Sequence, residues 1–226
     1  ATSAMNAPSV IERGAHWIAV HKPAGMSVHN DAGLDLLSWL SESYPASWHL
    51  VHRLDRETSG VVLACSDSAM LTEIQRQWSS VKKTYWLLVR GQVADRQRWD
   101  QPITDRSEGR RSPAGARQRR VAAETVVSVL DVGRHCSLLE AQLVTGRQHQ
   151  IRKHAVLNGH EILLDKRYGQ LKYVQGLAQR FPAENLCLHA VSLEMVLDGC
   201  RRQWRCPPPT SWDQFGIPVA ELWLRK

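Results

Sequence analysis

The sequence contains no hydrophobic run that approaches the roughly 20 residues of a transmembrane helix. Its first residues, Ala1–Pro8, are small and polar, and we therefore expect no secretory signal peptide. The five cysteines are odd in number, and none of them stands in a C-x-x-C pair. These absences favour a reduced protein of the cytoplasm that has neither a zinc site nor a membrane segment.

Clustered metal ligands are also scarce. The ten histidines are scattered along the chain. His149 and His154 are five residues apart, a spacing that separates two side chains around a helix. Only Glu57 stands near Asp55, and no glycine-rich loop of the kind that cradles phosphates is present. We therefore expect no metal and no cofactor, which weakens the alternative of a metal-dependent nuclease or another hydrolase acting on nucleic acid.

Charge of one sign predominates. The formal net charge of the 226 residues is +7, which favours an anionic partner, nucleic acid first. The region 92–120 is rich in polar residues, glycine and proline, and we interpret it as an exposed, mobile connection. It either contacts nucleic acid or is an ordinary solvated loop, and the sequence leaves both open. Its arginines include Arg106, Arg110, Arg111, Arg117, Arg119 and Arg120.

Short strand-like and helix-like segments alternate along the chain without an internal repeat. We predict an α+β fold with a mixed, mostly antiparallel sheet and flanking helices. Residues 1–10 are expected to be a disordered or expression-derived tail. Because no linker separates two cores, we expect residues 11–226 to form a single domain. The expected strands are 17–20, 61–65, 82–91, 121–130, 135–144 and 186–197, and the expected helices are 35–44, 68–79 and a segment between Gly146 and Gly159.

The most distinctive stretch is the polar run His52–Gly60, which is followed at once by the apolar strand Val61–Cys65. A Ser-Gly step into a buried strand places the polar residues at the rim of the sheet. Asp55 stands between two arginines in this run, and neighbouring cations favour the ionised form of a carboxylate. An ionised carboxylate suits a nucleophile or a base, although a solvated charged turn is the simpler alternative.

Two further stretches carry candidate functional residues. Tyr85 lies on an expected strand after two lysines, where packing is the ordinary role of a tyrosine. Arg147 and Arg152 lie at and after a strand-to-helix turn, where an arginine stem commonly covers apolar surface. Taken one by one, these signals are weak.

Together and in this order, these stretches resemble the RluA-type family of RNA pseudouridine synthases. His52–Gly60 is similar to the family signature H-R-L-D-x-x-T-S-G, and Thr145–His154 is similar to T-G-R-x-H-Q-[IL]-R-x-H. Lys83–Tyr85 and Lys22–Gly25 match shorter motifs, and Asn158–Gly169 resembles G-H-P-I-x-G-D-x-x-Y-G. The chain departs from the family patterns at four positions. The family usually has Asn in place of His21, Thr or Ser in place of Gln148, Pro in place of Glu161, and Gly in place of Leu164.

The resemblance implies a stand-alone catalytic domain without the auxiliary S4 domain. Such an enzyme isomerises specific uridines of tRNA or ribosomal RNA to pseudouridine without metal or cofactor. Whether the aspartate attacks the sugar or the base, or abstracts a ribose proton, stays open. A catalytically inactive RNA-binding protein on the same fold is the alternative. We expect a monomer that binds RNA, with no membrane and no obligatory protein partner.

The resemblance also implies roles for individual residues. Asp55 would be the nucleophile, Arg152 would hold its charge, and Tyr85 would hold the freed base. A uridine in folded RNA must first leave its stack, and Arg53 is placed in the sequence to fill the vacated space. The residues expected to contact RNA are His52, Arg53, Arg147, Arg110, Arg111, Arg119 and Arg120.

Overall fold

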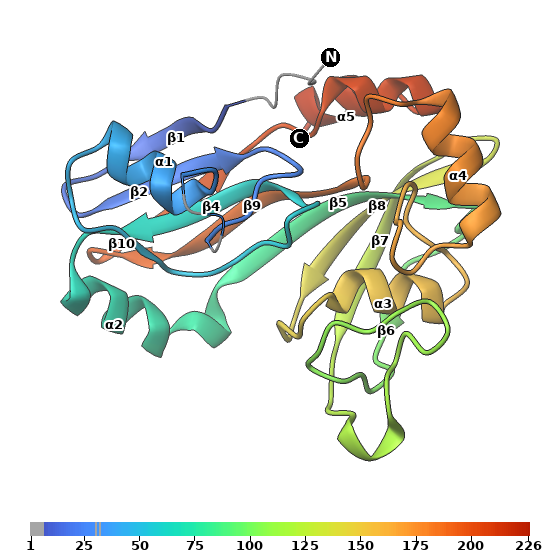
Figure 1. Ribbon diagram of the computed structural model, residues 1–226, viewed down its shortest axis with the longest axis horizontal. Coiled ribbons are helices and arrows are strands. Elements are labelled where there is room, and N and C mark those ends of the chain that lie inside the picture. The colour runs from blue at the N-terminus through green and yellow to red at the C-terminus, as the bar shows by residue number, and fades with distance from the viewer. Residues whose placement is uncertain (1–6, 30, 32) are drawn as a thin grey trace. The chain divides into compact units, whose positions relative to one another are not determined.

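The computed structural model describes residues 7–29, 31 and 33–226 and divides into two compact units (Figure 1). The first unit comprises residues 1–83 and 189–207, and the second comprises residues 84–188 and 208–226. The single domain expected over residues 11–226 stays a prediction. Along the described chain, no helix combines the length and apolarity needed to cross a membrane.

The first unit is built on a sheet whose neighbouring strands are mostly antiparallel. The exception is the parallel pair of β4 and β9, in which Ser59 lies opposite His189. Each of the other neighbouring pairs is antiparallel, in the order β1, β2, β4, with β10 beside β9 and β3 beside β4. The strands are β1 (Ser9–Arg13), β2 (Trp17–Lys22), β3 (His49–Leu50), β4 (Ser59–Cys65), β9 (Leu188–Leu197) and β10 (Cys200–Arg205).

Helix caps and apolar spacing explain the helices of this unit. The Asp35 carboxylate accepts a hydrogen bond from the Ser38 backbone N–H at 2.8 Å and starts α1 (Leu36–Ser43). Asp67 caps α2 (Ser68–Arg76), which buries Met70 and Ile74 against the sheet core. Both predicted helices are confirmed, although the second ends at residue 76 and a 3-10 turn, η1 (Trp78–Ser80), follows it.

The second unit carries an antiparallel sheet in the order β5, β8, β7, β6. Strand β5 begins with two residues of the first unit and continues through the second. The fold class expected from the sequence is therefore confirmed: mostly antiparallel strands with a few helices. The elements are β5 (Lys82–Arg90), β6 (Gln97–Trp99), β7 (Thr125–Val132), β8 (Cys136–Leu143), α3 (Gln150–Leu157), α4 (Leu171–Arg180), η3 (Thr210–Phe215) and α5 (Val219–Leu224).

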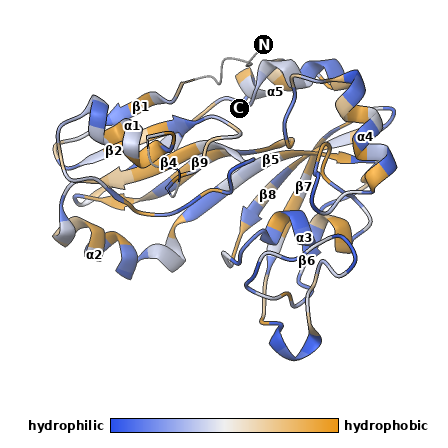
Figure 2. Ribbon diagram, viewed as in Figure 1, coloured by the Kyte–Doolittle hydropathy of each residue, from blue (hydrophilic) through white to orange (hydrophobic). Residues whose placement is uncertain are grey.

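The arginine-rich segment between β6 and β7 folds back on itself. Ile103 and Val121 pair across it, and the Thr104 N–H donates to the Ala114 carbonyl at 3.0 Å. Ile103, Ala114 and Ala123 form a small buried cluster. Figure 2 shows the tip at η2 (Arg117–Arg119) as hydrophilic. The arginines of the segment are exposed, as expected, except for the half-buried Arg110, and an apolar cluster at its base organises it.

The predicted tail of residues 1–10 is only partly described. Residues 1–6 lie outside the described residues. Ser9 and Val10, which we assigned to the tail, belong to β1 and lie opposite His21 and Val20. The first strand therefore begins before the expected boundary at residue 11.

Candidate active site

Asp55 lies in the first unit, in the turn that leads into β4, and is half-buried. The Thr58 N–H donates to the Asp55 carbonyl at 3.1 Å and closes the turn. Gly60, at φ +122°, lies so close to β9 that an added Cβ would come within 2.3 Å of the Ala190 carbonyl oxygen. Only glycine fits at this point, so the Ser-Gly step fixes the turn at the rim of the sheet.

A buried lysine ties the Asp55 turn to a neighbouring turn. The Lys22 side chain is fully buried, and its Nζ donates to the carbonyls of Pro23 at 2.9 Å, Met26 at 2.8 Å and Arg56 at 3.2 Å. Burial lowers the pKa of Lys22 to about 7, while Asp55 and other nearby charges act on it more weakly. The contact with Arg56 anchors the backbone next to Asp55. In the sequence, Lys22 is marked only by its place in the motif Lys22–Gly25.

The two arginines that flank Asp55 in the sequence differ in surroundings. The Arg56 guanidinium donates to Asp31 Oδ2 at 2.7 Å and to the Gly25 carbonyl at 3.1 Å. Arg53 is exposed. The flanking-charge argument from the sequence therefore overlooked Asp31 as an ion-pair partner of Arg56.

The His52 side chain contacts β4 and the Trp78 ring. Its Nε2 accepts a hydrogen bond from the Leu63 N–H at 3.1 Å, and its ring stacks on Trp78 with centroids 5.1 Å apart. Burial lowers the pKa of His52 to about 4, with the charge of Lys83 adding to the effect. A neutral His52 therefore supports the turn that carries Asp55. Its expected contact with RNA stays a prediction.

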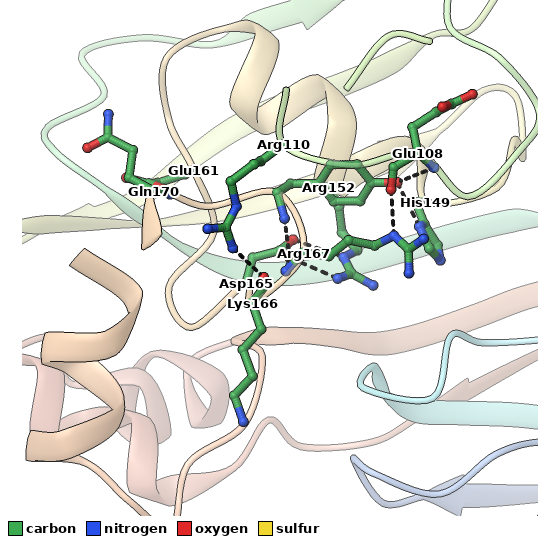
Figure 3. Close-up of polar contacts among 10 residues, drawn as sticks. Glu108, Arg110, His149, Arg152, Glu161, Asp165, Lys166, Arg167 and Gln170 are labelled. Carbon is green, nitrogen blue, oxygen red and sulfur yellow. Dashed lines mark hydrogen bonds and ion pairs between the residues drawn. The ribbon is translucent and has the colours of Figure 1, made fainter. Parts of the chain in front are cut away.

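Arg152, on α3 of the second unit, is held by a buried carboxylate. Its Nε and Nη2 donate to Asp165 Oδ2 at 2.9 Å and Oδ1 at 2.8 Å, and the two side chains are 3% and 1% exposed (Figure 3). Asp165 also accepts the backbone N–H groups of Arg167 and Tyr168 at 3.0 Å. Such a bidentate pair fixes both the position and the plane of the guanidinium. Leu164, the residue before Asp165, adopts φ +62° and has a buried side chain. The resembled motif has glycine at this position.

Tyr168 continues this network. Its ring packs on Arg152, with the centroid 5.3 Å from the guanidinium carbon. Its hydroxyl accepts the Glu108 N–H at 3.2 Å and lies 2.8 Å from His149 Nδ1. Burial raises the pKa of Tyr168 to about 12 and lowers that of His149 to about 4, so both are neutral near pH 7. Sequence reasoning quoted Asp165 and Tyr168 only within a motif, which was the available signal for them.

The arginine-rich segment is bonded to the same network. The Arg167 Nε donates to the Glu108 carbonyl at 2.6 Å. The fully buried Nζ of Lys153, on α3, donates to the carbonyls of Thr104 at 2.8 Å and Arg106 at 2.6 Å. Movement of the segment would therefore disturb α3 and the turn that holds Arg152.

The four arginines of this segment that are expected to contact RNA divide into two groups. Arg110 donates to the Lys166 carbonyl at 2.7 Å, and Arg120 donates twice to the Gly115 carbonyl, at 3.0 and 2.8 Å. Arg111 and Arg119 are exposed, and within the described residues their side chains make no hydrogen bond or ion pair. Arg110 and Arg120 thus each use donors to shape the segment, whereas the side-chain donors of Arg111 and Arg119 make no hydrogen bond with the described residues.

Arg147 and Tyr85 complete the predicted set. Arg147 donates to the Ala122 carbonyl at 3.3 Å and lies 3.8 Å from an Asp105 carboxylate oxygen. Tyr85 is half-buried on β5, opposite Ala141 of β8. Asp55 belongs to the first unit and Tyr85 to the second, so the joint geometry of the predicted catalytic residues stays a prediction. Over residues 7–29, 31 and 33–226, no three His, Cys, Asp or Glu side chains gather in a way that could hold a metal ion.

Comparison with known proteins shows the class to which this fold belongs. Residues 16–156 match the family model of RNA pseudouridylate synthases. The chain belongs to this family. A solved human structure, RNA Pseudouridylate Synthase Domain Containing 1, superposes with a TM-score of 0.77 at 22% identity, over 95% of this chain and 89% of that one.

Two curated bacterial relatives carry more specific names. Ribosomal large subunit pseudouridine synthase C of Vibrio cholerae is 33% identical over 197 residues, which are 80% of this chain and 59% of the relative. tRNA pseudouridine synthase C of Yersinia pestis is 31% identical over 206 residues, 82% of this chain and 80% of the relative. The chain thus spans about three fifths of the first relative. The predicted family is confirmed.

Proposed function

We propose that this protein converts specific uridines of tRNA or ribosomal RNA to pseudouridine, with Asp55 as the nucleophile and without a cofactor. The observation that carries the proposal is the buried, bidentate Arg152–Asp165 pair in a chain of this family. An arginine has five N–H donors, and Asp165 uses two of them. We propose that other donors of Arg152 hold the Asp55 carboxylate.

The proposed reaction breaks the bond between N1 of uracil and C1′ of the ribose, turns the base, and joins C5 to C1′. N1 gains a proton and C5 loses one, so the reaction needs no oxidant and no energy source. Asp55 stays ionised beside the reacting sugar and base, since Arg152 supplies the opposite charge. The ring of Tyr85 stacks on the detached uracil and keeps it in place while it turns.

The target uridine must leave its stack before it can react. Arg53 is exposed at the tip of the Asp55 turn, which suits a side chain that enters the vacated space. Lys22 and His52 hold this turn from within the first unit, so the tip can press against RNA without displacing the Asp55 backbone.

Replacement of Asp55 by asparagine tests the proposal most directly. We expect Asp55→Asn to abolish pseudouridine formation and to leave RNA binding within a few-fold, because only the charge is removed. The measurement is modification mapping on total RNA from a strain that lacks the gene, complemented with either form. Glu57→Gln removes a carboxylate from the same turn and should restore modification.

Loss of binding together with activity in Asp55→Asn would assign Asp55 a structural role. If the intact gene restored pseudouridine at no position, the protein would be an RNA-binding protein on an enzyme fold, the alternative raised by the sequence.

A further inference from the structure

The second unit contains a cavity beside the turn that holds Arg152. Its volume is about 560 Å³, within the roughly 300–1,000 Å³ of typical ligand pockets. It lies where the end of β5, the end of α3 and the turn before α4 meet, with one arginine of the arginine-rich segment on its wall. Its lining includes Arg90, Gln92, Arg110, Glu161, Tyr168 and Gln170.

One wall of the cavity is an arginine held in a fixed orientation. Arg90 Nη1 donates to Glu161 Oε1 at 2.8 Å and to Gln170 Oε1 at 2.9 Å. The guanidinium carbon lies 4.2 Å from the centroid of the Tyr173 ring, outside the cavity lining. Nε and Nη2 of Arg90 make no hydrogen bond with the described residues. This guanidinium is therefore preorganised and still has donors for a ligand.

A second arginine reaches the cavity from the arginine-rich segment. Arg110 is half-buried, and its Nη2 donates to the Lys166 carbonyl at 2.7 Å (Figure 3). Its other N–H groups likewise make no hydrogen bond along the described chain. Against these two cations stands one carboxylate, Glu161, whose two oxygens already accept from Arg90 and from the Gln170 N–H. The lining thus has an excess of positive charge and unused donors.

The carboxylate that fixes Arg90 is a feature of this chain that the resembled motif does not contain. Glu161 stands where that motif has proline, which can neither accept an ion pair nor hold an arginine. The Glu161 side chain is 9% exposed, and the side chain of its partner, Arg90, is 42% exposed. A mostly buried glutamate that holds a half-exposed arginine at the cavity wall favours a binding function over a purely structural one.

We propose that this cavity binds a second, unstacked nucleotide of the RNA substrate, with its phosphate between Arg90 and Arg110. The proposal rests on the proposed function and adds to it a subsite for RNA recognition. Arginine is suited to bidentate contact with phosphate. The cavity is larger than a phosphate requires, and polar groups such as Gln92 and Gln170 can bind the edge of a base. Tyr168 lines the cavity and packs on Arg152, so the occupant contacts the support of the proposed catalytic arginine.

A charge series at Gln92 tests the subsite without disturbing the arginines. Gln92 is exposed and lines the cavity, and its side chain makes one exposed hydrogen bond, to the Gly133 carbonyl at 3.3 Å, so its replacement should have little effect on folding. We expect Gln92→Glu to raise KM for the mapped RNA substrate about two- to fivefold with little change in kcat, because it repels the phosphate. Gln92→Lys should lower KM or leave it unchanged. The matched control is Gln179→Glu, an exposed position on α4 outside the cavity lining.

Cross-linking identifies the occupant directly. RNA substrates are prepared with 4-thiouridine at single positions other than the target uridine, irradiated with the intact protein, and the joined peptide is identified by mass spectrometry. We expect one position to join to residues 90–92 or 168–170, and Gln92→Glu to reduce that product. Equal KM values for Gln92→Glu and the control, or no product at these residues, would overturn the subsite. An intact protein that modifies no RNA would instead overturn the proposed function.

Discussion

The two regions that carry the predicted catalytic residues fix them in different ways. In the first unit, Lys22 binds the Arg56 carbonyl next to Asp55, His52 binds the backbone of β4, and the Asp55 side chain is half-buried. In the second unit, a buried carboxylate binds the Arg152 guanidinium itself. The first region thus stabilises a turn, whereas the second orients a single side chain. Substitutions in the two regions should therefore have different consequences.

The largest effect on stability is expected at Asp165, which holds the Arg152 side chain. Asp165→Ala leaves a buried arginine without its carboxylate, and we expect the free energy of unfolding to fall by about 3 to 5 kcal/mol. Pseudouridine formation should fall further than the loss of folded protein accounts for. Chemical denaturation and initial rates on the mapped RNA measure the two effects.

The control for Asp165→Ala is a surface ion pair of the same unit. Arg98→Gln breaks the exposed pair with Glu124, and we expect a loss of less than about 1 kcal/mol. Similar losses in the two variants would show that Asp165 does not fix Arg152, and the contrast between the two regions would then be wrong.

An intermediate effect on stability, which depends on pH, is expected at His52, the residue that supports the Asp55 turn. The pKa of His52 is about 4 in the folded chain against 6.5 as its ordinary value, so the unfolded chain binds more protons between these values. The stabilisation by His52 is complete above pH 6.5 and is lost as pH falls toward 4. We expect the difference in unfolding free energy between the intact protein and His52→Gln to shrink by about 1 to 3 kcal/mol over this window.

Denaturation curves at several pH values measure that difference, and comparison of the two proteins cancels the contribution of the other histidines. A difference that stays constant between pH 7 and pH 4 would mean that His52 does not support the turn as a neutral ring.

The smallest effect is expected at the exposed arginines. Arg111→Gln and Arg119→Gln should each reduce the slope of log binding constant against log salt by about 1, because each removes one phosphate contact. Arg120→Gln should instead lower stability, since its guanidinium holds the Gly115 carbonyl. RNA binding at several salt concentrations measures the slopes. Unchanged slopes for Arg111→Gln and Arg119→Gln would make the segment an ordinary solvated loop.

Much of the fold follows from local patterns in the sequence. The near-continuous apolar runs predict β4 and β5, and apolar spacing with an N-terminal aspartate predicts α1 and α2. We missed β10, whose sequence is largely polar. The sequence did contain a signal for this strand, the pair Asp198 and Gly199. Both residues have positive φ and form the tight turn that pairs β10 with β9.

Other elements gave weaker local signals. Helix α4 buries only Val174 and has no side-chain cap, but Leu171, Val174 and Leu177 recur at helical spacing, a signal that we missed. The arginine-rich segment has a composition typical of a solvated loop. Its order depends on Ile103, Ala114 and Ala123, which are too far apart in the sequence to form a pattern.

The sequence by itself determined the turn that carries Asp55, because a Ser-Gly step before a buried strand is a local feature. It also determined the family, through runs of residues in a fixed order. Only the tertiary structure decided which groups hold the candidate residues: Lys22 reaches the Arg56 carbonyl 34 positions away, and Lys153 reaches the Thr104 carbonyl 49 positions away. The physical reason is that a buried cation takes whichever acceptors the packed chain brings to it, and these acceptors are backbone carbonyls, which every residue type provides.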